Sequence, residues 1–528
     1  MWYNCGMKIR AATAVFLLAT LAEAGSPYPK MWVFNNYRMN TDEGWASFSN
    51  MVVRAAAVGY NGVLTGSQLE NAMNNWDKRA RANYAKARDL CASLGMEIIP
   101  DVWGLGYGGP VCYRDPENVE ATAMKDLVYV SDGKALRFAP QPVPKEAFNT
   151  DDFGVRTVKA HLKPFRRYRI QFKLKTENLL PDIYYKFRIS CSYVKTREHQ
   201  LYDPPMKPTQ DWTDVTFTFD TYESGDINFG AGKGRRDMTG SYQVKDVVIE
   251  ERGPCHMLST DGMAPVVRDA ATGAAYEAGK DYAPFPKMRR FRDEPDSKLV
   301  ETAIPAGSRI APGTKVLVDC WIPAVEGQRQ YSGCPSAAGA YRYFEESAKE
   351  VEAFFHPKTW MLGIDEWRVA NRCRRCQARN VTPAELMGEC TARQHAIIRK
   401  VSPNAEICAW ADMFAPTDNA HDHYYCVKGD ITGSWNYVPK DIIMVVWMNG
   451  RGPVAFKHFA DNGFRTLAGI YYDAPNLDAD RRWIAECNRT PGCLGTMYTT
   501  FEQKYGLLED FAKMSKEEGR PLARQQEK

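Results

Sequence analysis

Residues 360–368 have the sequence Trp-Met-Leu-Gly-Ile-Asp-Glu-Trp-Arg. This segment gives the first indication of the fold of the whole chain. The run is apolar apart from Gly363 until it reaches two adjacent acids, Asp365 and Glu366. We interpret it as a buried strand that ends in two carboxylates. Burying carboxylates in a core is costly, whereas the carboxyl ends of the strands form the mouth of a (β/α)8 barrel, where active sites lie. Two solvated acids at a strand end would give the same pattern, so the surrounding sequence has to decide.

Around that strand the chain alternates between helical patterns and short apolar runs. An apolar stripe at helical spacing covers residues 341–355. Thr382, Pro383 and Glu385 signal the start of another helix, because they supply an N-cap, a proline at the first helical position and a capping box. Apolar runs that we expect to be strands follow at 407–410, 442–447, 466–472 and 494–499, and a last helix is expected at 505–513.

The same alternation occupies the first part of the chain. We expect strands at 31–37, 62–64 and 96–100, with helices at 45–58 and 80–94 between them. Three strands here and five after residue 340 make the eight βα units of a (β/α)8 TIM barrel, an α/β fold. An open doubly wound sheet is the alternative. Because no Gly-x-Gly-x-x-Gly follows the first strand, a dinucleotide site is not expected.

Between the two barrel parts the helical period disappears. Strand-like runs occur at 168–174, 184–192, 212–219 and 242–249, with turn-rich pieces between them. This pattern predicts an antiparallel β-sandwich that interrupts the barrel after its third strand. We therefore expect a first barrel part at 27–118, a β-rich insertion at 119–323, a second barrel part at 324–515 and a polar tail at 516–528.

The composition and the first residues bear on location and partners. The chain has 68 Lys and Arg against 64 Asp and Glu, a balance that argues against binding to nucleic acid or to a membrane surface. Residues 1–24 have the pattern of a signal peptide, with Lys8 and Arg10 before an apolar run and a small-x-small cleavage site ending at Ala24. No other run is long and apolar enough to span a membrane. We expect a secreted or periplasmic protein.

The cysteines allow two interpretations. There are 14, of which Cys5 lies in the signal peptide, so an odd number remains and the pairing cannot be deduced from the sequence. Cys373-x-x-Cys376, followed by Cys390, has spacing that also occurs in zinc sites. Because an exported protein can form disulfides, we favour a structural disulfide or simple thiols, and the sequence predicts neither metal nor cofactor.

Polar and aromatic side chains collect where the expected strands end. The candidates are Asp365, Glu366, Trp410, Asp412, Trp447, Tyr472, Asp473, Tyr498 and Glu502, with Trp103 from the third strand. In a barrel these positions converge on one mouth. Cleavage of a glycosidic bond needs a protonated carboxyl beside the leaving oxygen and a second group facing the anomeric carbon. Aromatic rings supply flat apolar platforms for a sugar.

The strand-end motifs resemble those of glycoside hydrolase family 20, the β-N-acetylhexosaminidases. That family carries an Asp-Glu pair at the end of its fourth strand in a His-x-Gly-Gly-Asp-Glu context; here residues 361–366 read Met-Leu-Gly-Ile-Asp-Glu. The family's next strand ends in Trp-x-(Asp/Glu)-Met, and here Trp410-Ala411-Asp412-Met413 is similar. The resemblance implies that Glu366 is the general acid/base and that Asp365 orients the 2-acetamido group of the substrate.

The resemblance also implies positions for substrate binding and a choice of mechanism. Trp447 and Tyr472-Asp473 correspond to the family's pocket residues on the sixth and seventh strands. If the acetamido group attacks the anomeric carbon, no enzymic nucleophile is needed; otherwise Asp412 or Asp473 serves as nucleophile or base. A glycosidase of another sugar specificity and a non-catalytic glycan-binding protein remain alternatives. The expected partner is a glycan, and the insertion is a candidate carbohydrate-binding module.

Overall fold

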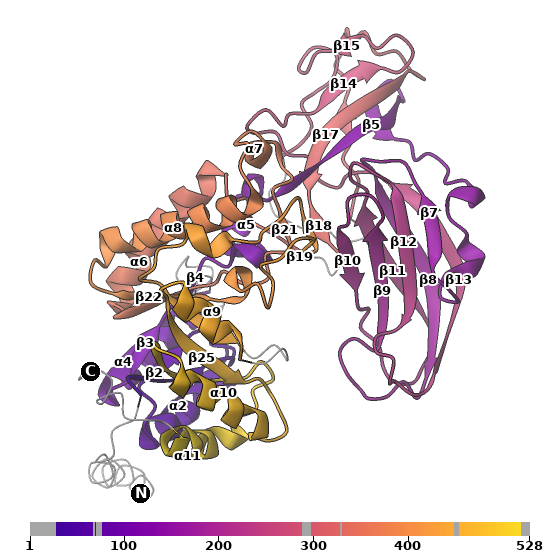
Figure 1. Ribbon diagram of the computed structural model, residues 1–528. Coiled ribbons are helices and arrows are strands. Elements are labelled where there is room, and N and C mark those ends of the chain that lie inside the picture. The colour runs from indigo at the N-terminus through magenta and orange to yellow at the C-terminus, as the bar shows by residue number, and fades with distance from the viewer. Residues whose placement is uncertain are drawn as a thin grey trace, which may run out of the picture.

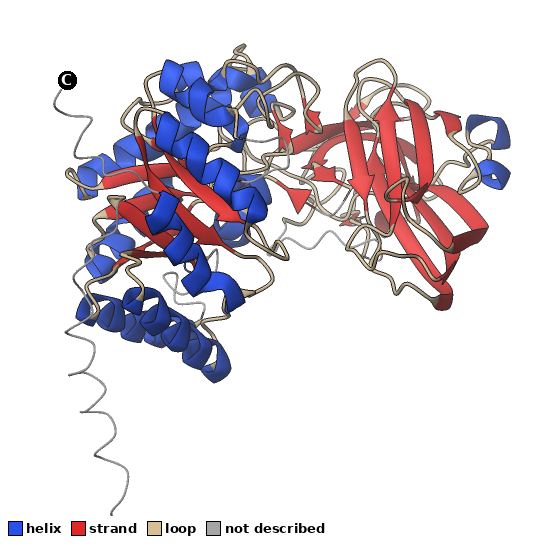
Figure 2. Cartoon of the chain, turned by 60° about the horizontal axis from the view of Figure 1, so that its bottom comes forward, coloured by secondary structure: helices blue, strands red, loops and turns tan. Residues whose placement is uncertain are grey.

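The computed structural model describes residues 28–66, 69, 77–287, 297–327, 330–447 and 453–518. The predicted signal peptide and residues 519–528 of the predicted tail lie outside them. Within the described ranges, no helix combines the length and apolarity needed to cross a membrane. In Figure 1 the chain forms one body of mixed helices and strands and a second body built mainly of strands. Figure 2 shows that most helices surround the sheet of the first body.

The first body is organised around a nine-stranded sheet in which every pairing is parallel. In spatial order the strands are β3 (Glu97–Ile99), β2 (Gly62–Leu64), β1 (Lys30–Phe34), β26 (Cys493–Thr499), β25 (Arg465–Tyr471), β24 (Ile443–Trp447), β22 (Glu406–Trp410), β20 (Thr359–Leu362) and β4 (Asp101–Val102).

This sheet is nearly closed into a barrel. Its two outermost strands, β3 and β4, are consecutive in the sequence and are separated only by Pro100. β3 pairs with β2 and β4 pairs with β20, so the same stretch of chain lies at both ends of the spatial order. Proline has no backbone N–H to donate to a neighbouring strand, which accounts for the interruption. The prediction of a parallel α/β barrel is confirmed at this level.

The described helices include those expected at 45–58, 80–94, 341–355, after Thr382 and at 505–513, with ends that differ by up to five residues, together with short helices that were not predicted. They are α2 (Asp42–Ala57), α4 (Lys78–Ser93), α5 (Gly109–Arg114), α6 (Ala338–Phe355), α7 (Arg374–Gln377), α8 (Pro383–Val401), α9 (Ala455–Asp461), α10 (Asp478–Arg489) and α11 (Leu508–Glu518), with short 3-10 turns η1 (Leu105–Tyr107) and η5 (Asp412–Phe414). Thr382 caps α8 by accepting a hydrogen bond from the N–H of Glu385 at 3.1 Å. Gly59 and Gly95 follow α2 and α4 at positive φ, as their place after a helix predicts.

The barrel has an inner and an outer apolar core. Alternate residues of the strands point inward because side chains alternate along a strand. The inner cluster contains Trp32, Phe34, Leu64, Ile99, Met361, Cys408, Trp410, Ile443, Val445, Leu467 and Met497. The residues between them, such as Trp360 and Leu362, face the helices and join a larger cluster. A strand that is buried on both faces is expected to be apolar throughout, which is the pattern of residues 360–364.

Among the described residues between β4 and α6, three antiparallel sheets have three or more strands each. One has the order β10 (His199–Tyr202), β9 (Phe187–Tyr193), β12 (Asp226–Lys233) and β7 (Val158–His161); the second has the order β11 (Gln210–Asp220), β8 (Arg167–Glu177) and β13 (Ser241–Arg252). The third has the order β15 (Ala275–Tyr276), β14 (Val266–Asp269), β17 (Lys315–Pro323), β5 (Ala121–Ser131), β6 (Ala135–Phe138) and β16 (Thr302–Ala303).

These sheets have two separate apolar cores, whereas the sequence predicted a single β-rich insertion. The first two sheets share an apolar cluster that includes Phe172, Phe187 and Phe229, and we call residues 158–252 the two-sheet unit. The third sheet has a separate cluster around Leu127 and Val318. Alternation of apolar and polar residues marks each strand but does not encode which strands share a core. Two short ladders, β18 (Val325–Glu326) with β19 (Gln330–Tyr331) and β21 (Val369–Ala370) with β23 (Cys426–Val427), lie between these sheets and the barrel.

Candidate active site at the carboxyl ends of the barrel strands

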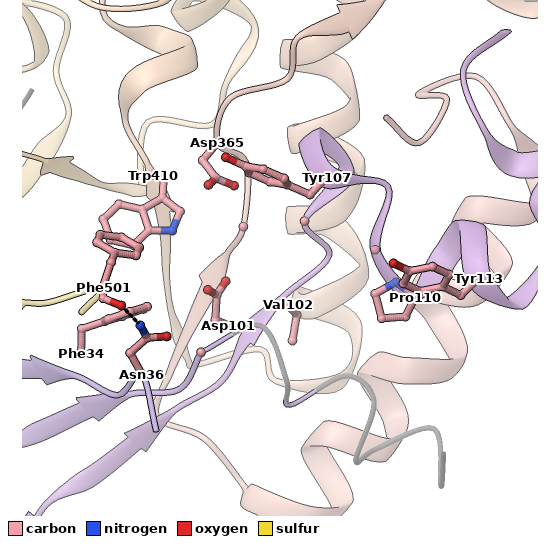
Figure 3. A pocket seen from close by; sticks show the side chains of 14 residues that line it. Phe34, Asn36, Asp101, Val102, Tyr107, Pro110, Tyr113, Asp365, Trp410 and Phe501 are labelled. Carbon is pink, nitrogen blue, oxygen red and sulfur yellow. Dashed lines mark hydrogen bonds between the residues drawn. The ribbon is translucent and has the colours of Figure 1, made fainter. Parts of the chain in front are cut away.

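Two cavities lie at the carboxyl ends of the barrel strands. The smaller has a volume of about 190 Å³ and is lined by Tyr107, Asp365, Glu366, Trp410, Asp412, Trp447, Tyr472 and Phe501. The larger, of about 540 Å³, shares Tyr107, Asp365, Trp410 and Phe501 with it and extends over Phe34, Asn36, Asp101 and Tyr113. Figure 3 shows the larger cavity, with Asp365 and Tyr107 close together and Trp410 and Phe501 on the opposite side.

Glu366 is held in a strained and specific conformation. Its φ of 39° lies in the left-handed region, which is unfavourable for a residue with a side chain. Its carbonyl oxygen accepts hydrogen bonds from the amide of Gln330 at 2.7 Å and from the N–H of Arg368 at 2.8 Å. The Arg368 guanidinium contacts the carboxylate at 3.2 Å, and the Tyr107 hydroxyl donates to its other oxygen. The side chain is 26 % exposed, so the carboxyl group remains open to the cavity.

Asp412 supports Glu366 from beneath. Its Oδ2 accepts hydrogen bonds from the N–H of Glu366 at 2.9 Å and from the amide of Asn419 at 2.7 Å. Its Oδ1 is buried and has no hydrogen-bond partner among the described residues. Burial raises the pKa of Asp412 well above the ordinary value, and the negative charges of Asp365 and Asp418 add to the effect. This carboxyl group therefore favours its protonated form at a pH where a solvated aspartate is ionised.

Asp365 shares the same electrostatic environment. It lines both cavities. Burial raises its pKa well above the ordinary value, and the nearby charges of Asp101 and Glu366 raise it further. Several carboxyl groups in one pocket cannot all ionise at normal cost, because like charges at close range repel. Asp365 and Asp412 therefore keep their protons to a higher pH than solvated aspartates do, and protonated carboxyls are a requirement for general acid chemistry.

Aromatic rings form the wall opposite the carboxyls. The rings of Trp447 and Tyr472 lie 5.2 Å apart at a tilt of 37°, and Tyr472 contacts Phe501 at 4.9 Å. Phe34 joins them, with its ring centroid 5.3 Å from that of Phe501 and 6.4 Å from that of Trp410. Such a wall offers flat apolar contact to one face of a ring-shaped polar ligand.

Six of the ten residues expected from the sequence line the smaller cavity: Asp365, Glu366, Trp410, Asp412, Trp447 and Tyr472. The other four are not among the lining residues of either cavity. Trp103 is 2 % exposed and packs outward against Phe344 and Trp360, because its backbone turns at a positive φ. Tyr498 is buried in the outer core and stacks on Tyr471 at 4.3 Å.

Asp473 lies just after β25, and Glu502 lies on the loop after the last strand, β26. Asp473 accepts hydrogen bonds from the N–H groups of Phe501 at 2.7 Å and Glu502 at 3.2 Å, and from the hydroxyl of Thr500. It therefore shapes the loop that presents Phe501 to the cavity. Glu502 is exposed and pairs with Lys504 at 2.6 Å. Position at a strand end predicts neither the backbone contacts of Asp473 nor the exposure of Glu502, because the loop conformation decides which side chains turn inward.

Several residues of the site were not singled out from the sequence, among them Tyr107, Asp101, Phe501 and Arg368. Asp101 ends the third strand, so the strand-end criterion already contained the signal. Arg368 follows Glu366 by two residues, and its charge beside two acids was a second signal. Tyr107 and Phe501 lie on loops, where no periodic pattern distinguishes a lining residue from an exposed one.

Comparison with known proteins gives a limited result. No protein-family model matches the sequence, and no curated protein matches it. Among solved structures, a Streptomyces plicatus N-acetyl-β-hexosaminidase aligns with 94% of this chain and 65% of its own, at 9% identity and a TM-score of 0.38. A rhamnosidase from Novosphingobium sp. PP1Y aligns with 92% of this chain and 56% of its own, at 10% identity and a TM-score of 0.31.

A family 20 exo-β-N-acetylglucosaminidase from Vibrio harveyi aligns over a smaller share, 39% of this chain and 34% of its own, at 15% identity and a TM-score of 0.28. The alignments thus span less than two thirds of each of these three proteins. At such identities and TM-scores, the likenesses define neither the fold nor the activity of this chain. The barrel-like sheet and the site described above rest on the chain's own geometry.

Proposed function

We propose that this protein is a glycoside hydrolase in which Glu366 is the general acid. The observation that carries the proposal is the smaller cavity, where a positioned glutamate and two further carboxyls face a wall of aromatic rings. Glycosidic cleavage requires that combination, because the leaving oxygen must receive a proton while positive charge develops on the sugar ring. We also propose that β3 and β4 count as one strand, which makes the sheet an eight-stranded (β/α)8 barrel, and that the protein is exported.

The chemistry assigns separate roles to the carboxyls. Glu366 donates its proton to the glycosidic oxygen as the bond to the anomeric carbon breaks, and it later accepts a proton from the attacking water. In a 2-acetamido sugar the acetamido oxygen attacks the anomeric carbon, and Asp365 holds the acetamido N–H and the positive charge that develops there. The motif at residues 361–366 supports this substrate-assisted route, because the two acids stand together at the end of β20.

A second candidate is a glycosidase that uses two enzymic carboxylates. The place of Asp412 in the lining of the smaller cavity favours it, because a second carboxyl beside Glu366 supplies, once ionised, the nucleophile or base that this mechanism needs. The two routes differ in substrate. Substrate assistance requires the 2-acetamido group, whereas a two-carboxylate mechanism accepts sugars without it.

The first experiment measures nitrophenol release from aryl β-glycosides of N-acetylglucosamine, N-acetylgalactosamine, glucose, galactose and fucose. We expect turnover of the 2-acetamido sugars only. Turnover of the other sugars would favour the role of Asp412 over that of Asp365. If no glycoside in a broad panel is cleaved while glycans still bind, the protein is a binding protein and the proposal fails.

Glu366→Gln tests the acid itself. We expect kcat to fall by about 10²- to 10⁴-fold, because the amide cannot donate a proton to the leaving oxygen. The loss should be larger for an alkyl glycoside than for a nitrophenyl glycoside, since a poor leaving group depends more on protonation. Glu502→Gln is the matched control, because the Glu502 carboxylate is exposed and pairs with Lys504 outside both cavities. Equal losses for both leaving groups would contradict the acid role.

A further inference from the structure

Three cysteines and one glutamate meet in the core between the barrel and the antiparallel sheets. The Sγ atom of Cys334 lies 3.3 Å from that of Cys373 and 3.5 Å from that of Cys376. An Oε atom of Glu120 lies 3.5 Å from the Cys376 sulfur. One donor atom from each of the four residues fits within a group in which no two atoms are more than 4.8 Å apart. All four residues are buried, and the carboxyl of Glu120 is fully removed from solvent.

The local backbone arranges these donors. Cys373 is the N-cap of the short helix α7, and its sulfur accepts a hydrogen bond from the N–H of Cys376 at 3.4 Å. The spacing of three residues thus turns both sulfurs to the same side. One oxygen of Glu120 accepts from the N–H groups of Arg372 at 2.6 Å and Cys373 at 2.8 Å, which leaves the other oxygen directed at the sulfurs.

A disulfide does not account for this arrangement. A disulfide joins two sulfurs and would leave the third thiol and the carboxyl without a role, whereas here the sulfur of Cys334 is almost equally close to two others. A buried carboxylate requires a cationic partner. The positive charge of Arg375 acts on Glu120, while its guanidinium donates to the backbone oxygens of Glu117 and Val119, both at 2.7 Å, and pairs with Asp261 at 3.4 Å. Arg375 balances part of the negative charge that thiolates and a carboxylate would carry.

We propose that Cys334, Cys373, Cys376 and Glu120 bind one structural zinc ion. Three soft sulfur donors and one oxygen donor within 4.8 Å of one another match the preference of Zn²⁺, and a closed set of four protein ligands is typical of structural sites. This replaces the disulfide or simple thiols favoured from the sequence for Cys373 and Cys376. Cys390 is not part of the site, since it lies on α8.

The zinc ion would join three segments that are far apart in the sequence. Glu120 lies just before β5, where the chain leaves the barrel for the antiparallel sheets. Cys334 lies just before α6, where the chain returns. Cys373 and Cys376 lie on the loop that follows Glu366. A single ion would therefore fasten both crossings of the insertion to the loop that carries the candidate acid, and its binding energy would contribute to folding.

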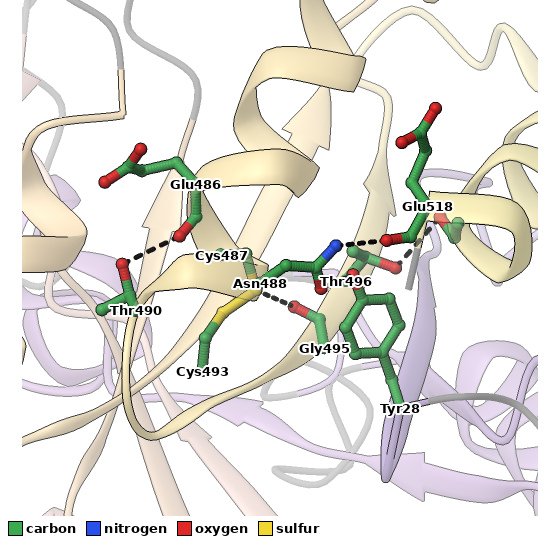
Figure 4. The surroundings of a disulfide bond; sticks show 10 residues. Tyr28, Glu486, Cys487, Asn488, Thr490, Cys493, Gly495, Thr496 and Glu518 are labelled. Carbon is green, nitrogen blue, oxygen red and sulfur yellow. Dashed lines mark hydrogen bonds between the residues drawn. A yellow bond between two sulfur atoms is a disulfide. The ribbon is translucent and has the colours of Figure 1, made fainter. Parts of the chain in front are cut away.

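The test uses the full chain, secreted into an oxidising compartment and purified without chelator. We expect elemental analysis to find about one zinc per chain. Replacement of the zinc by Co²⁺ should give the sulfur-to-metal charge-transfer band and the intense visible bands of a tetrahedral thiolate site. Peptide mapping after alkylation should find Cys487 joined to Cys493, which proves that the sample met oxidising conditions, while Cys334, Cys373 and Cys376 remain reduced. Figure 4 shows the Cys487–Cys493 disulfide at the end of α10.

Variants separate the ligands from other buried cysteines. Cys373→Ser and Cys334→Ser should lose at least nine tenths of the zinc, whereas Cys390→Ser, also a buried cysteine, should retain it. Glu120→Gln keeps its shape and should bind zinc more weakly in competition with a chelator. A disulfide between any two of Cys334, Cys373 and Cys376, or three reduced thiols with no metal in the wild type, would overturn the proposal. These wild-type measurements decide the question even if the serine variants do not fold.

Discussion

Tyr107 shows how one hydroxyl group can matter at the scale of a single residue. Burial raises the pKa of Tyr107 above its ordinary value, as do the charges of Glu366 and Asp365, so the hydroxyl stays protonated and donates a hydrogen bond to the Glu366 carboxylate. We predict that Tyr107→Phe lowers kcat/KM on the best aryl glycoside by about 10-fold or more, because a hydrogen bond to a charged group contributes about 1.5–3 kcal/mol. Tyr113→Phe is the control, since Tyr113 lines only the larger cavity. Equal effects of the two variants would contradict this role.

Ionisation of the Asp365 carboxyl should lower the free energy of unfolding as the pH rises. The pKa of this carboxyl is raised in the folded protein by burial and by the charges of Asp101 and Glu366. Above the ordinary pKa of about 3.9, the unfolded chain releases the proton while the folded chain keeps it. The folded state then binds more protons, so the free energy of unfolding falls as the pH rises between the ordinary and the raised value.

Asp365→Asn should remove that dependence. We expect the variant to be more stable than the wild type above the ordinary pKa, with the difference shrinking as the pH falls below about 4, where both states become protonated. Urea unfolding at a series of pH values measures it. A difference that stays constant with pH would show that the carboxyl does not titrate with folding. The expected loss of activity in the same variant would make Asp365 a residue that costs stability and supports function.

At the scale of elements, the end of β25 depends on one buried acid of α10. The N–H of Tyr471 donates to Asp480 at 2.6 Å, at the point where Tyr471, Tyr472 and Asp473 adopt positive φ values. This contact fixes the turn that carries Tyr472 into the cavity. Burial raises the pKa of Asp480 to about 6, against the lowering effect of its hydrogen bonds with backbone N–H groups.

We predict that Asp480→Ala lowers the free energy of unfolding by about 1–3 kcal/mol, because it leaves a buried N–H without an acceptor. Asp480→Asn keeps an acceptor and should lose less. Because the folded pKa is raised, wild-type stability should fall as the pH rises from about 4 to about 6, and the Asn variant should lack this fall. Denaturant titrations at pH 4 and pH 7 test both statements. If the Ala variant is as stable as the Asn variant, the hydrogen bond that Asp480 accepts from Tyr471 does not stabilise the protein.

At the scale of the whole molecule, the two-sheet unit is joined to the barrel by a buried charge. The Arg372 guanidinium lies over the ring of Tyr222 at 3.5 Å and pairs with Glu198, and both acceptor and donor are almost fully buried. Val369 and Cys426, from loops of the barrel, belong to the apolar cluster of the two-sheet unit. We therefore expect the barrel and the two-sheet unit to unfold together, as one calorimetric transition.

Arg372→Ala should destabilise the protein by about 3–5 kcal/mol, because it leaves Glu198 charged and buried without a partner. Lys457→Ala is the control, since the exposed pair of Lys457 with Asp461 at 2.6 Å should contribute at most about 1 kcal/mol. Thermal unfolding of both variants gives the comparison. Two separate wild-type transitions, with Arg372→Ala changing neither, would show that the two bodies are independent.

Much of this architecture could be predicted because its causes are local. Apolar residues at a period of two or 3.6 mark strands and helices wherever one face is buried, and a cap such as Thr382 satisfies N–H groups within its own helix turn. The strand-end rule also brought Asp365, Glu366, Trp410, Asp412, Trp447 and Tyr472 to one cavity, since parallel strands end at the same edge. It placed Trp103 and Tyr498 there as well, because it does not specify which way a side chain turns.

The sequence by itself determined the order of the elements and the strand ends at which the carboxyls gather. Only the tertiary structure decided which distant side chains meet them. Tyr107 reaches Glu366 across 259 residues, and Cys334 reaches Cys373 across 39. Such contacts depend on how the sheet closes and where the antiparallel sheets dock. The local spacing of apolar residues predicts neither the closure of the sheet nor the docking of the antiparallel sheets, because the free energy of closure is spread over the whole packed core.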